Sequence, residues 1–273
     1  MTAVPAKVYD RLTSGLKRFQ PILSSAKARD AGEADTSTIV KDMLCDVFGY
    51  DKYTEVTAEH IIKGTFCDLA VKLDGKLQLL IEVKAIGLEL KDGHIKQAVD
   101  YAANQGTEWV ILTNGSTWRI YRVFFSQPIA NELVFECDLL SINPKNRGAI
   151  ENLFLFAREG QTKSVLQDFH AQRQATSRYF LAAVILSESV LEVIRRELRR
   201  AFPDVRIDSD QLREELVSEV LKREVTEGER ADDARKKISR SQGKALRVRA
   251  KAADGESIEI VDGRTPQVPD QLV

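Results

Sequence analysis

The stretch Gly64–Ala85 reads GTFCDLAVKLDGKLQLLIEVKA, and its pattern decides the fold. Two mainly apolar runs, residues 65–73 and 77–85, flank the pair Asp74-Gly75. A short turn of this composition between two such runs is typical of a β-hairpin. The continuous apolar triplet Leu79-Leu80-Ile81 is typical of a strand that is covered on both faces. The sequence therefore predicts a hairpin in the middle of a sheet.

Of the six charged residues in this stretch, Asp68, Glu82 and Lys84 are the ones that could meet on one face. Glu82 and Lys84 are two positions apart, so their side chains share one face of the strand. A two-residue loop would place Asp68 opposite Ile81, on the other face. A three-residue loop of residues 73–75, closed by a bulge, would bring Asp68 to the face of Glu82. We expect the three-residue loop.

An acid pair next to an amine has chemical consequences in such a place. Polar alternation on a strand usually means one face in water, but unpaired charges are rare on a covered hairpin. Two carboxylates about 4 Å apart repel by roughly 4 kcal/mol at an effective dielectric near 20. Lys84 offsets part of this repulsion, and a divalent cation offsets more; oxygen ligands suit Mg²⁺. Such an ion polarises a phosphate and activates water, while Lys84 stabilises the phosphorane or orients the nucleophile.

Helices and further strands surround the hairpin in sequence. Apolar residues recur at helical spacing over residues 8–19, 30–48 and 94–104. Strands are predicted at 108–112 and 117–125. This order predicts an α/β (α+β) fold, with a mixed central sheet flanked by helices.

The residue composition and the hydrophobic periodicity of the chain change twice along its length. We expect a first domain over residues 1–145, a helical accessory region over 146–228 and a flexible charged tail over 229–273. In the helical region, Ser177 is expected to cap one long helix that ends at Phe202-Pro203. The basic part of the tail either contacts nucleic acid or is simply solvated, and the sequence leaves both readings open.

Composition limits the class of protein. In 273 residues, 40 Lys and Arg nearly balance 41 Asp and Glu, so any attraction for a polyanion must be local or assisted by cations. No apolar run approaches the roughly 20 residues that span a bilayer, so we expect a cytoplasmic protein without a membrane partner. The three cysteines are expected to be buried thiols. Neither they nor the three histidines have the spacing of a zinc site or a nucleophilic triad. A glycine-rich phosphate loop of an ATPase motor is also absent from the sequence.

The pattern resembles the PD-(D/E)xK nuclease superfamily, and more narrowly the N-terminal nuclease domain of type I restriction enzyme R subunits. The resemblance spans about Asp30–Val123 and implies a restriction-endonuclease-like fold. The strand acid of that family falls on Asp68, and its Glu-x-Lys falls on Glu82-Val83-Lys84. One departure is Cys67, which stands where the family nominally has proline.

Three weaker motifs extend the resemblance. Gly32-Glu33-Ala34-Asp35-Thr36 resembles the start of the family's first helix, and Glu33 falls on a core-facing stripe as a supporting acid near the metal. Gln97 and Tyr101, four apart and therefore on one helical face, resemble its Gln-x-x-x-Tyr, although such a pair is more often an ordinary helix surface. Thr113-Asn114-Gly115, followed by Trp118 and Tyr121, resembles the strand-turn-strand that closes such domains.

The resemblance implies a complete set of functional residues. The catalytic residues would be Glu33, Asp68, Glu82, Lys84, Gln97 and Tyr101. The metal would be held by Asp68, Glu82, Glu33 and the backbone carbonyl of Val83. It would be Mg²⁺, with Mn²⁺ as a substitute.

The implied function is a Mg-dependent endodeoxyribonuclease of restriction or phage defence, with DNA as substrate. Because duplex cleavage needs two cuts, a homodimer or a larger restriction or defence complex is expected. One alternative is a non-cleaving nucleic-acid-binding or scaffold protein that keeps the nuclease fold. Another is a helical interaction protein whose residues 146–226 recruit a partner.

Overall fold

The computed structural model describes residues 3–62 and 65–255, with side chains described for 3–58 and 67–243. The chain divides into two compact units, one up to His170 and one from Ala171 onward. This division lies later than the boundary expected after residue 145. The reason is that residues of the stretch 150–166 belong to the hydrophobic core of the first unit.

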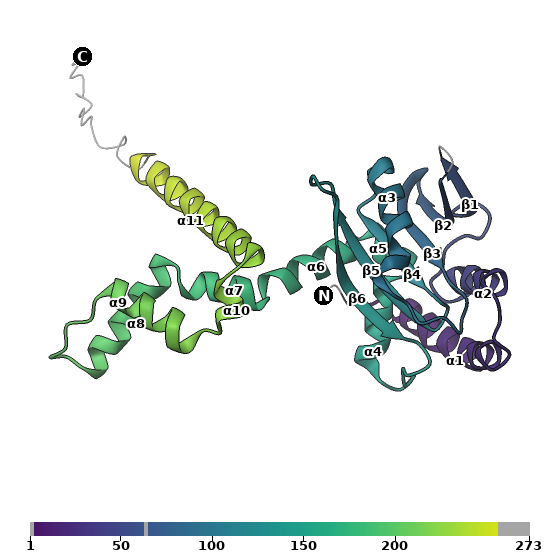
Figure 1. Cartoon of the computed structure of the whole chain (residues 1–273), viewed down its shortest axis with the longest axis horizontal. Coiled ribbons are helices and arrows are strands. Elements are labelled where there is room, and N and C mark those ends of the chain that lie inside the picture. Colours follow the sequence, from purple (N-terminus) through teal and green to yellow (C-terminus); the bar gives the residue numbers. More distant parts are fainter. Residues whose placement is uncertain (1–2, 63–64, 256–273) are drawn as a thin grey trace, which may run out of the picture. The chain divides into compact units, whose positions relative to one another are not determined.

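A six-stranded mixed sheet forms the centre of the first unit and confirms the expected α/β class (Figure 1). Its strands lie side by side in chain order. They are β1 (Val56–Ile62), β2 (Thr65–Leu73), β3 (Lys76–Val83), β4 (Trp109–Thr113), β5 (Thr117–Phe124) and β6 (Ala130–Asp138). Only β3 and β4 pair in parallel; the other neighbours are antiparallel.

The hairpin of β2 and β3 forms as expected, but its loop is different. Leu73 pairs with Lys76, so the loop is the two-residue turn Asp74-Gly75, and both residues adopt positive φ (50° and 75°). The three-residue loop was therefore wrong. Asp68 nevertheless reaches the face of Glu82, because a β-bulge at Gln78 shifts the register so that Leu69 pairs with Ile81.

Helices cover both faces of this sheet. On one face, α1 (Ala6–Ala28) and α2 (Glu33–Asp46) bury the predicted apolar stripes, such as Leu12 and Val40, against Leu69 and Ile81. On the other face, the 3₁₀ turn η1 (Asp92–Ile95) and α3 (Lys96–Gln105) cover Leu80. The remaining elements of this unit are α4 (Arg147–Asn152), η2 (Leu153–Leu155) and α5 (Arg158–Thr162), and α6 (Val165–Ala175) begins in it.

The second unit consists of helices in its described part. They are α7 (Arg178–Ile185), α8 (Glu188–Ala201), α9 (Ser209–Glu215), the π-helical turn η3 (Leu216–Val220), α10 (Arg223–Thr226) and α11 (Glu229–Gly255). The Ser177 cap is confirmed, since its Oγ accepts from the N–H of Phe180. The single long helix expected after it is two helices, because Ser187 has extended backbone angles and separates α7 from α8.

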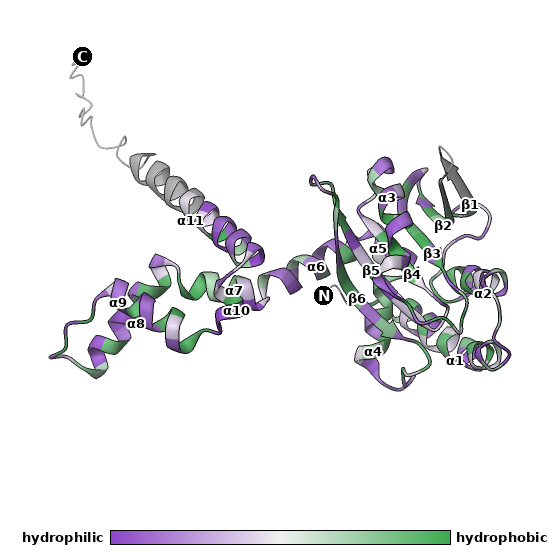
Figure 2. Cartoon of the chain, viewed as in Figure 1, coloured by the Kyte–Doolittle hydropathy of each residue, from purple (hydrophilic) through white to green (hydrophobic). Residues whose placement is uncertain are grey.

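The expected flexible tail was wrong over its first part. Residues 229–255 form α11, whose first turns pack Ala231 and Ala234 into the unit. The acidic residues Glu229 and Asp232 lie in its first turn, where they complement the helix dipole. Residues 256–273 lie outside the described part. Figure 2 shows that hydrophilic residues dominate the described first turns of α11. Among residues 3–62 and 65–255, no helix has both the length and the apolar character to cross a bilayer.

Substitution of Gly15 tests the contact between α1 and α2. A methyl group added there would lie 2.9 Å from Cγ2 and 3.2 Å from Cα of Val47, so Gly15→Ala should destabilise the first unit by about 1–3 kcal/mol. Gly148→Ala in α4, whose nearest neighbour atom lies at 3.7 Å, should be neutral or slightly stabilising. Both tryptophans belong to the first unit, so denaturant unfolding followed by their fluorescence measures the difference. Equal midpoints for the two variants would contradict this packing.

Candidate active site

Lys84 lies at the carboxyl end of β3, between two acidic side chains. Its Nζ donates to Oε1 of Glu82 at 2.6 Å and forms a longer ion pair with Oε2 of Glu33 at 3.7 Å. The Glu82 side chain is 7% exposed, that of Lys84 18% and that of Glu33 51%. The backbone N–H of Lys84 donates to the carbonyl of Thr113 at 2.8 Å and so continues the parallel pairing with β4. The amine is thereby fixed to the sheet and to α2 at once.

Asp68 joins this group from β2. One of its carboxylate oxygens accepts from the N–H of Val83 at 2.7 Å, and the residue is half-buried. Its charge acts on both Glu82 and Lys84. The predicted convergence of Asp68, Glu82 and Lys84 is therefore what the structure shows.

Glu33 reaches the group from the first turn of α2. It was expected on a core-facing stripe, but its side chain is half-exposed at the first residue of the helix, whereas Thr36 and Val40 on the same stripe are buried. The adjacent Thr36 explains how this turn is held. Its buried hydroxyl accepts from the N–H of Ile86 at 3.1 Å and donates to the carbonyl of Gly32 at 2.9 Å. The helix start is thus attached to the segment that follows Lys84.

Asn114 also holds the segment that follows Lys84. Its amide donates to the carbonyl of Leu88 at 2.8 Å, while its Oδ1 accepts from the N–H of Thr117 at 2.8 Å. Gly115 adopts positive φ (83°), and its carbonyl accepts from the indole N–H of Trp118. Thr36 and Asn114 therefore hold the backbone around the site. The sequence analysis included both only as members of longer motifs and did not assign them this role.

Burial and neighbouring charge shift the two innermost titratable groups. Burial raises the pKa of Glu82, with further rises from the charges of Asp68 and Glu33, against the opposing effect of Lys84. Burial alone would lower the pKa of Lys84. The hydrogen bond to Glu82 and the charges of Glu82, Glu33 and Asp68 outweigh it, so the pKa of Lys84 is raised and its amine is a cation at neutral pH.

The two residues of the Gln-x-x-x-Tyr motif have different surroundings on α3. Tyr101 is buried in the core between α3 and the sheet, where its pKa is raised by burial and by the neighbouring Cys67. Gln97 is exposed. The cysteine that replaces proline is fully buried; its Sγ donates to the carbonyl of Ile81, and burial raises its pKa to about 12. The other two cysteines, Cys45 and Cys137, were also expected to be buried, but they are only half-buried.

The two histidines with described side chains, His94 and His170, have partners outside this group of residues. His170 is buried between Arg122 and Glu132, at 3.0 and 3.2 Å, and packs beside Trp109. The ring of His94 accepts from the backbone N–H of Lys91. The side chain of His60 lies outside the described residues.

The side chains around Lys84 offer carboxylate oxygens, the ligand type that Mg²⁺ prefers. Asp68, Glu82 and Glu33 bring three carboxylates to one amine, which leaves an excess of two negative charges around Lys84. Within the described residues, no three His, Cys, Asp or Glu side chains gather closely enough to form a ready-made metal cluster. Mg²⁺ usually keeps several waters and is bound through one or two protein carboxylates.

Comparison with known proteins agrees with the expected family over part of the chain. Residues 40–134 match the family model described as type I restriction enzyme R protein N terminus (HSDR_N). The matched stretch lies within the region that resembles the PD-(D/E)xK nucleases in sequence, and it includes Asp68, Glu82 and Lys84 but begins after Glu33. No curated protein and no solved structure matches the chain significantly.

Removal of the Thr36 hydroxyl tests how the start of α2 is attached. Thr36→Val keeps the shape of the side chain but leaves the buried N–H of Ile86 without its acceptor, which should cost about 1–3 kcal/mol of unfolding free energy. Thr38→Val is the matched control. Its hydroxyl bonds only to the carbonyl of Ala34 on the exposed side of the same helix, so the change should be within about 0.5 kcal/mol. Tryptophan fluorescence during urea unfolding measures both, and equal losses would show that the Thr36 bond contributes nothing particular.

Proposed function

We propose, from the restriction-enzyme match of residues 40–134, that this chain is a Mg²⁺-dependent endodeoxyribonuclease acting in restriction or phage defence. The single observation that supports it best is the position of Lys84. The Lys84 ammonium lies between the buried carboxylate of Glu82 and the half-exposed carboxylate of Glu33, and Asp68 is close by. Acids and an amine grouped in this way suit the hydrolysis of a phosphodiester with the help of a metal ion. Ordinary surface polarity does not bury a carboxylate to this extent.

Asp68 and Glu82 would hold the metal, together with the backbone carbonyl of Val83. The hydrogen bond from Val83 to Asp68 fixes the strand acid against the backbone of β3, so the two acids keep their relative positions. Glu33 supports them from α2. Mg²⁺, or Mn²⁺ in its place, would supply polarisation of the scissile phosphate and a more acidic bound water.

Lys84 would serve as a fixed positive charge. As the negative charge on the phosphoryl oxygens grows, an ammonium already held by backbone and side-chain contacts stabilises it without having to be brought into place. Glu82 keeps this ammonium at the end of β3 and out of bulk water. Gln97 and Tyr101 are assigned a supporting role by the resemblance alone. Tyr101 would act through the buried hydrophobic cluster that it shares with Cys67.

One observation favours a second candidate, a nucleic-acid-binding protein that keeps the fold without cutting. The bond of 2.6 Å between Lys84 and Glu82 also satisfies both groups without a metal. A binder of this kind would retain DNA in calcium and release no nicked product. A homodimer or a complex with motor and specificity chains is part of the main proposal, because duplex cleavage needs two strand cuts.

Nicking of supercoiled plasmid tests the role of Lys84. With Mg²⁺ or Mn²⁺ the wild type should nick, and Lys84→Ala should be slower by about 100-fold or more, because a preorganised charge at the reacting phosphate is lost. Lys76→Ala, in the same hairpin but exposed next to its turn, should nick like the wild type.

Two outcomes of this assay would overturn the enzymatic proposal. Equal nicking by wild type and the folded Lys84→Ala protein would identify a contaminating nuclease. Tight DNA binding in calcium with no nicking in any metal would favour the non-cleaving protein.

Metal binding can be measured separately from activity. A bound ion stabilises the folded state by mass action, so Mn²⁺ in excess should raise the Tm of the first unit, read from tryptophan fluorescence. Asp68→Asn should abolish most of that rise. Asp74→Asn also removes a carboxylate of this hairpin, but from its turn, where asparagine tolerates positive φ, and should leave the rise intact. An identical rise for both variants would mean that the ion binds elsewhere.

A further inference from the structure

The strongest charge asymmetry of the chain lies in α11. Between Arg235 and Lys251, eight of 17 residues are Lys or Arg and none is Asp or Glu. Three of the four acids of this helix, Glu229, Asp232 and Asp233, come before that stretch, and Asp254 follows it. The chain as a whole has a formal net charge of −1, so this concentration of positive charge is a local feature.

Packing within the second unit orients the described part of α11. Ala231 and Ala234 are buried on one side, and Gln242 on the same side donates to Oγ of Ser189 at 3.2 Å. Lys236 and Arg240 are exposed, and neither forms an ion pair with any side chain in the described part of the chain. Lys236 and Arg240 are therefore not neutralised by the described side chains around them.

Such an arrangement has an energetic cost in the isolated protein. Lys236 and Arg240 are four residues apart on one helical face, where like charges destabilise a helix by about 0.2–0.5 kcal/mol per pair. Asp232 lies four residues before Lys236 but pairs with Arg235. The residues three and four positions from Arg240 include no acid. An external polyanion would offset the remaining repulsion.

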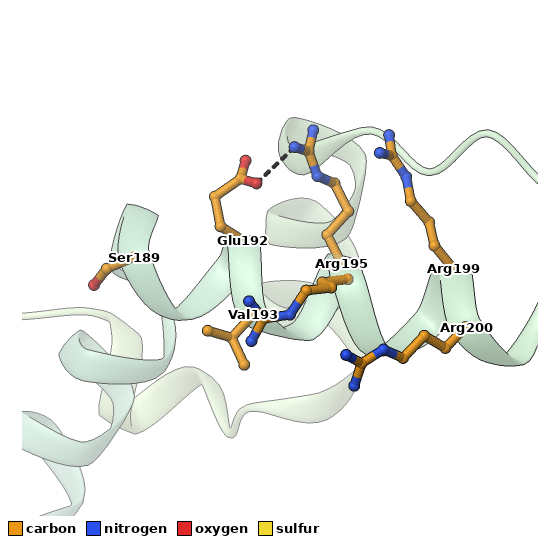
Figure 3. A pocket seen from close by; sticks show the side chains of 7 residues that line it. Ser189, Glu192, Val193, Arg195, Arg199 and Arg200 are labelled. Carbon is orange, nitrogen blue, oxygen red and sulfur yellow. Dashed lines mark hydrogen bonds and ion pairs between the residues drawn. The ribbon is translucent and has the colours of Figure 1, made fainter.

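A second basic surface adjoins the first within the same unit. An open cavity of about 610 Å³ on α8 is lined by Arg195, Arg196, Arg199 and Arg200, and Ser189, the partner of Gln242, lies at its edge. Figure 3 shows Arg195 and Arg199 projecting in the same direction from α8. Glu192 pairs with Arg195 and Glu197 with Arg200, but Arg199 forms no ion pair within the described residues.

We propose that α11 and the arginine cavity of α8 together form a binding surface for the sugar-phosphate backbone of double-stranded DNA. Guanidinium and ammonium groups on exposed helix faces bind phosphates and release the counterions that surround DNA. The proposal rests on the proposed function for the identity of the polyanion. It assigns to the second unit a DNA contact that is independent of Lys84 and the acids of the first unit.

The character of α11 favours DNA over an anionic membrane. A helix that lies in a membrane interface presents large apolar or aromatic side chains on one face. Residues 229–255 include no aromatic residue, and the exposed residues of the described stretch 229–243 are charged residues, serines and one glycine. The exposed side therefore offers charge without an apolar surface to insert.

The salt dependence of DNA binding tests this surface. The full chain carrying Asp68→Asn, without divalent metal, is titrated onto a labelled duplex of about 30 base pairs at salt concentrations of about 50–200 mM. Combined Arg199→Gln, Lys236→Gln and Arg240→Gln should reduce the slope of log K against log salt by about 2–3, because each phosphate contact contributes about 0.9.

A matched control removes the same charge elsewhere. Lys7, Lys17 and Lys27 are exposed on α1, and their combined change to glutamine should leave the slope unaltered. Circular dichroism should show unchanged helix content in both triple variants. Vesicles containing phosphatidylserine serve as the competing polyanion, and the full chain should not bind them at salt concentrations where it binds DNA.

Three results would overturn the proposal: an unchanged slope in the triple variant, an equal fall in the α1 control, or preferential binding to the vesicles. These outcomes are separate from those of the nicking assay. A chain that nicks DNA through Lys84 but keeps its full salt slope in the triple variant would retain the proposed function and lose this inference. If the wild type does not nick DNA but the triple variant shows the reduced slope, the DNA-binding surface is retained and the proposed nuclease function is lost.

Discussion

Burial of the Glu82 carboxylate is the constraint on which the rest of the site depends. A carboxylate removed from water must be matched by positive charge and hydrogen bonds, because its desolvation otherwise drives it to bind a proton. Lys84 supplies positive charge through a hydrogen bond of 2.6 Å, which lowers the pKa of Glu82. Burial and the charges of Asp68 and Glu33 raise that pKa. Because Asp68 and Glu33 add further negative charge around the same amine, one lysine cannot neutralise the group. This excess of negative charge at the end of β3 is what the proposed Mg²⁺ would balance.

The topology explains why these residues meet. β3 and β4 are the only parallel neighbours in the described sheet, and α3 lies in the crossover between them. Ligand sites of α/β sheets lie at the carboxyl ends of such strands, where chain segments diverge and leave side chains accessible. Here, the diverging segment after Lys84 is held by hydrogen bonds with both Thr36 and Asn114. These neutral bonds bring Glu33 to the site without placing further charge in the core.

The sequence predicted the local parts of this arrangement and missed those that depend on tertiary context. Alternation in a short strand fixed the shared face of Glu82 and Lys84, and helical stripes located α1, α2 and α3. The bulge at Gln78 has no signal in the sequence. It corrects an error in the loop length, so Asp68 was placed properly for the wrong reason. Strands β1 and β6 were missed because each lies at an edge of the sheet; β6 has a partly exposed, irregular pattern in place of a continuous apolar run. Charge density suggested disorder for α11, although its early alanines pack against the unit.

The most direct test of the metal-site account is the anomalous diffraction of Mn²⁺ in crystals of the wild-type protein. The account predicts one strong peak within about 2.5 Å of carboxylate oxygens of both Asp68 and Glu82, with the Lys84 amine displaced from or shared with its present partner. Absence of a peak there at a metal concentration that supports binding, or a peak bound only by other residues, would contradict it.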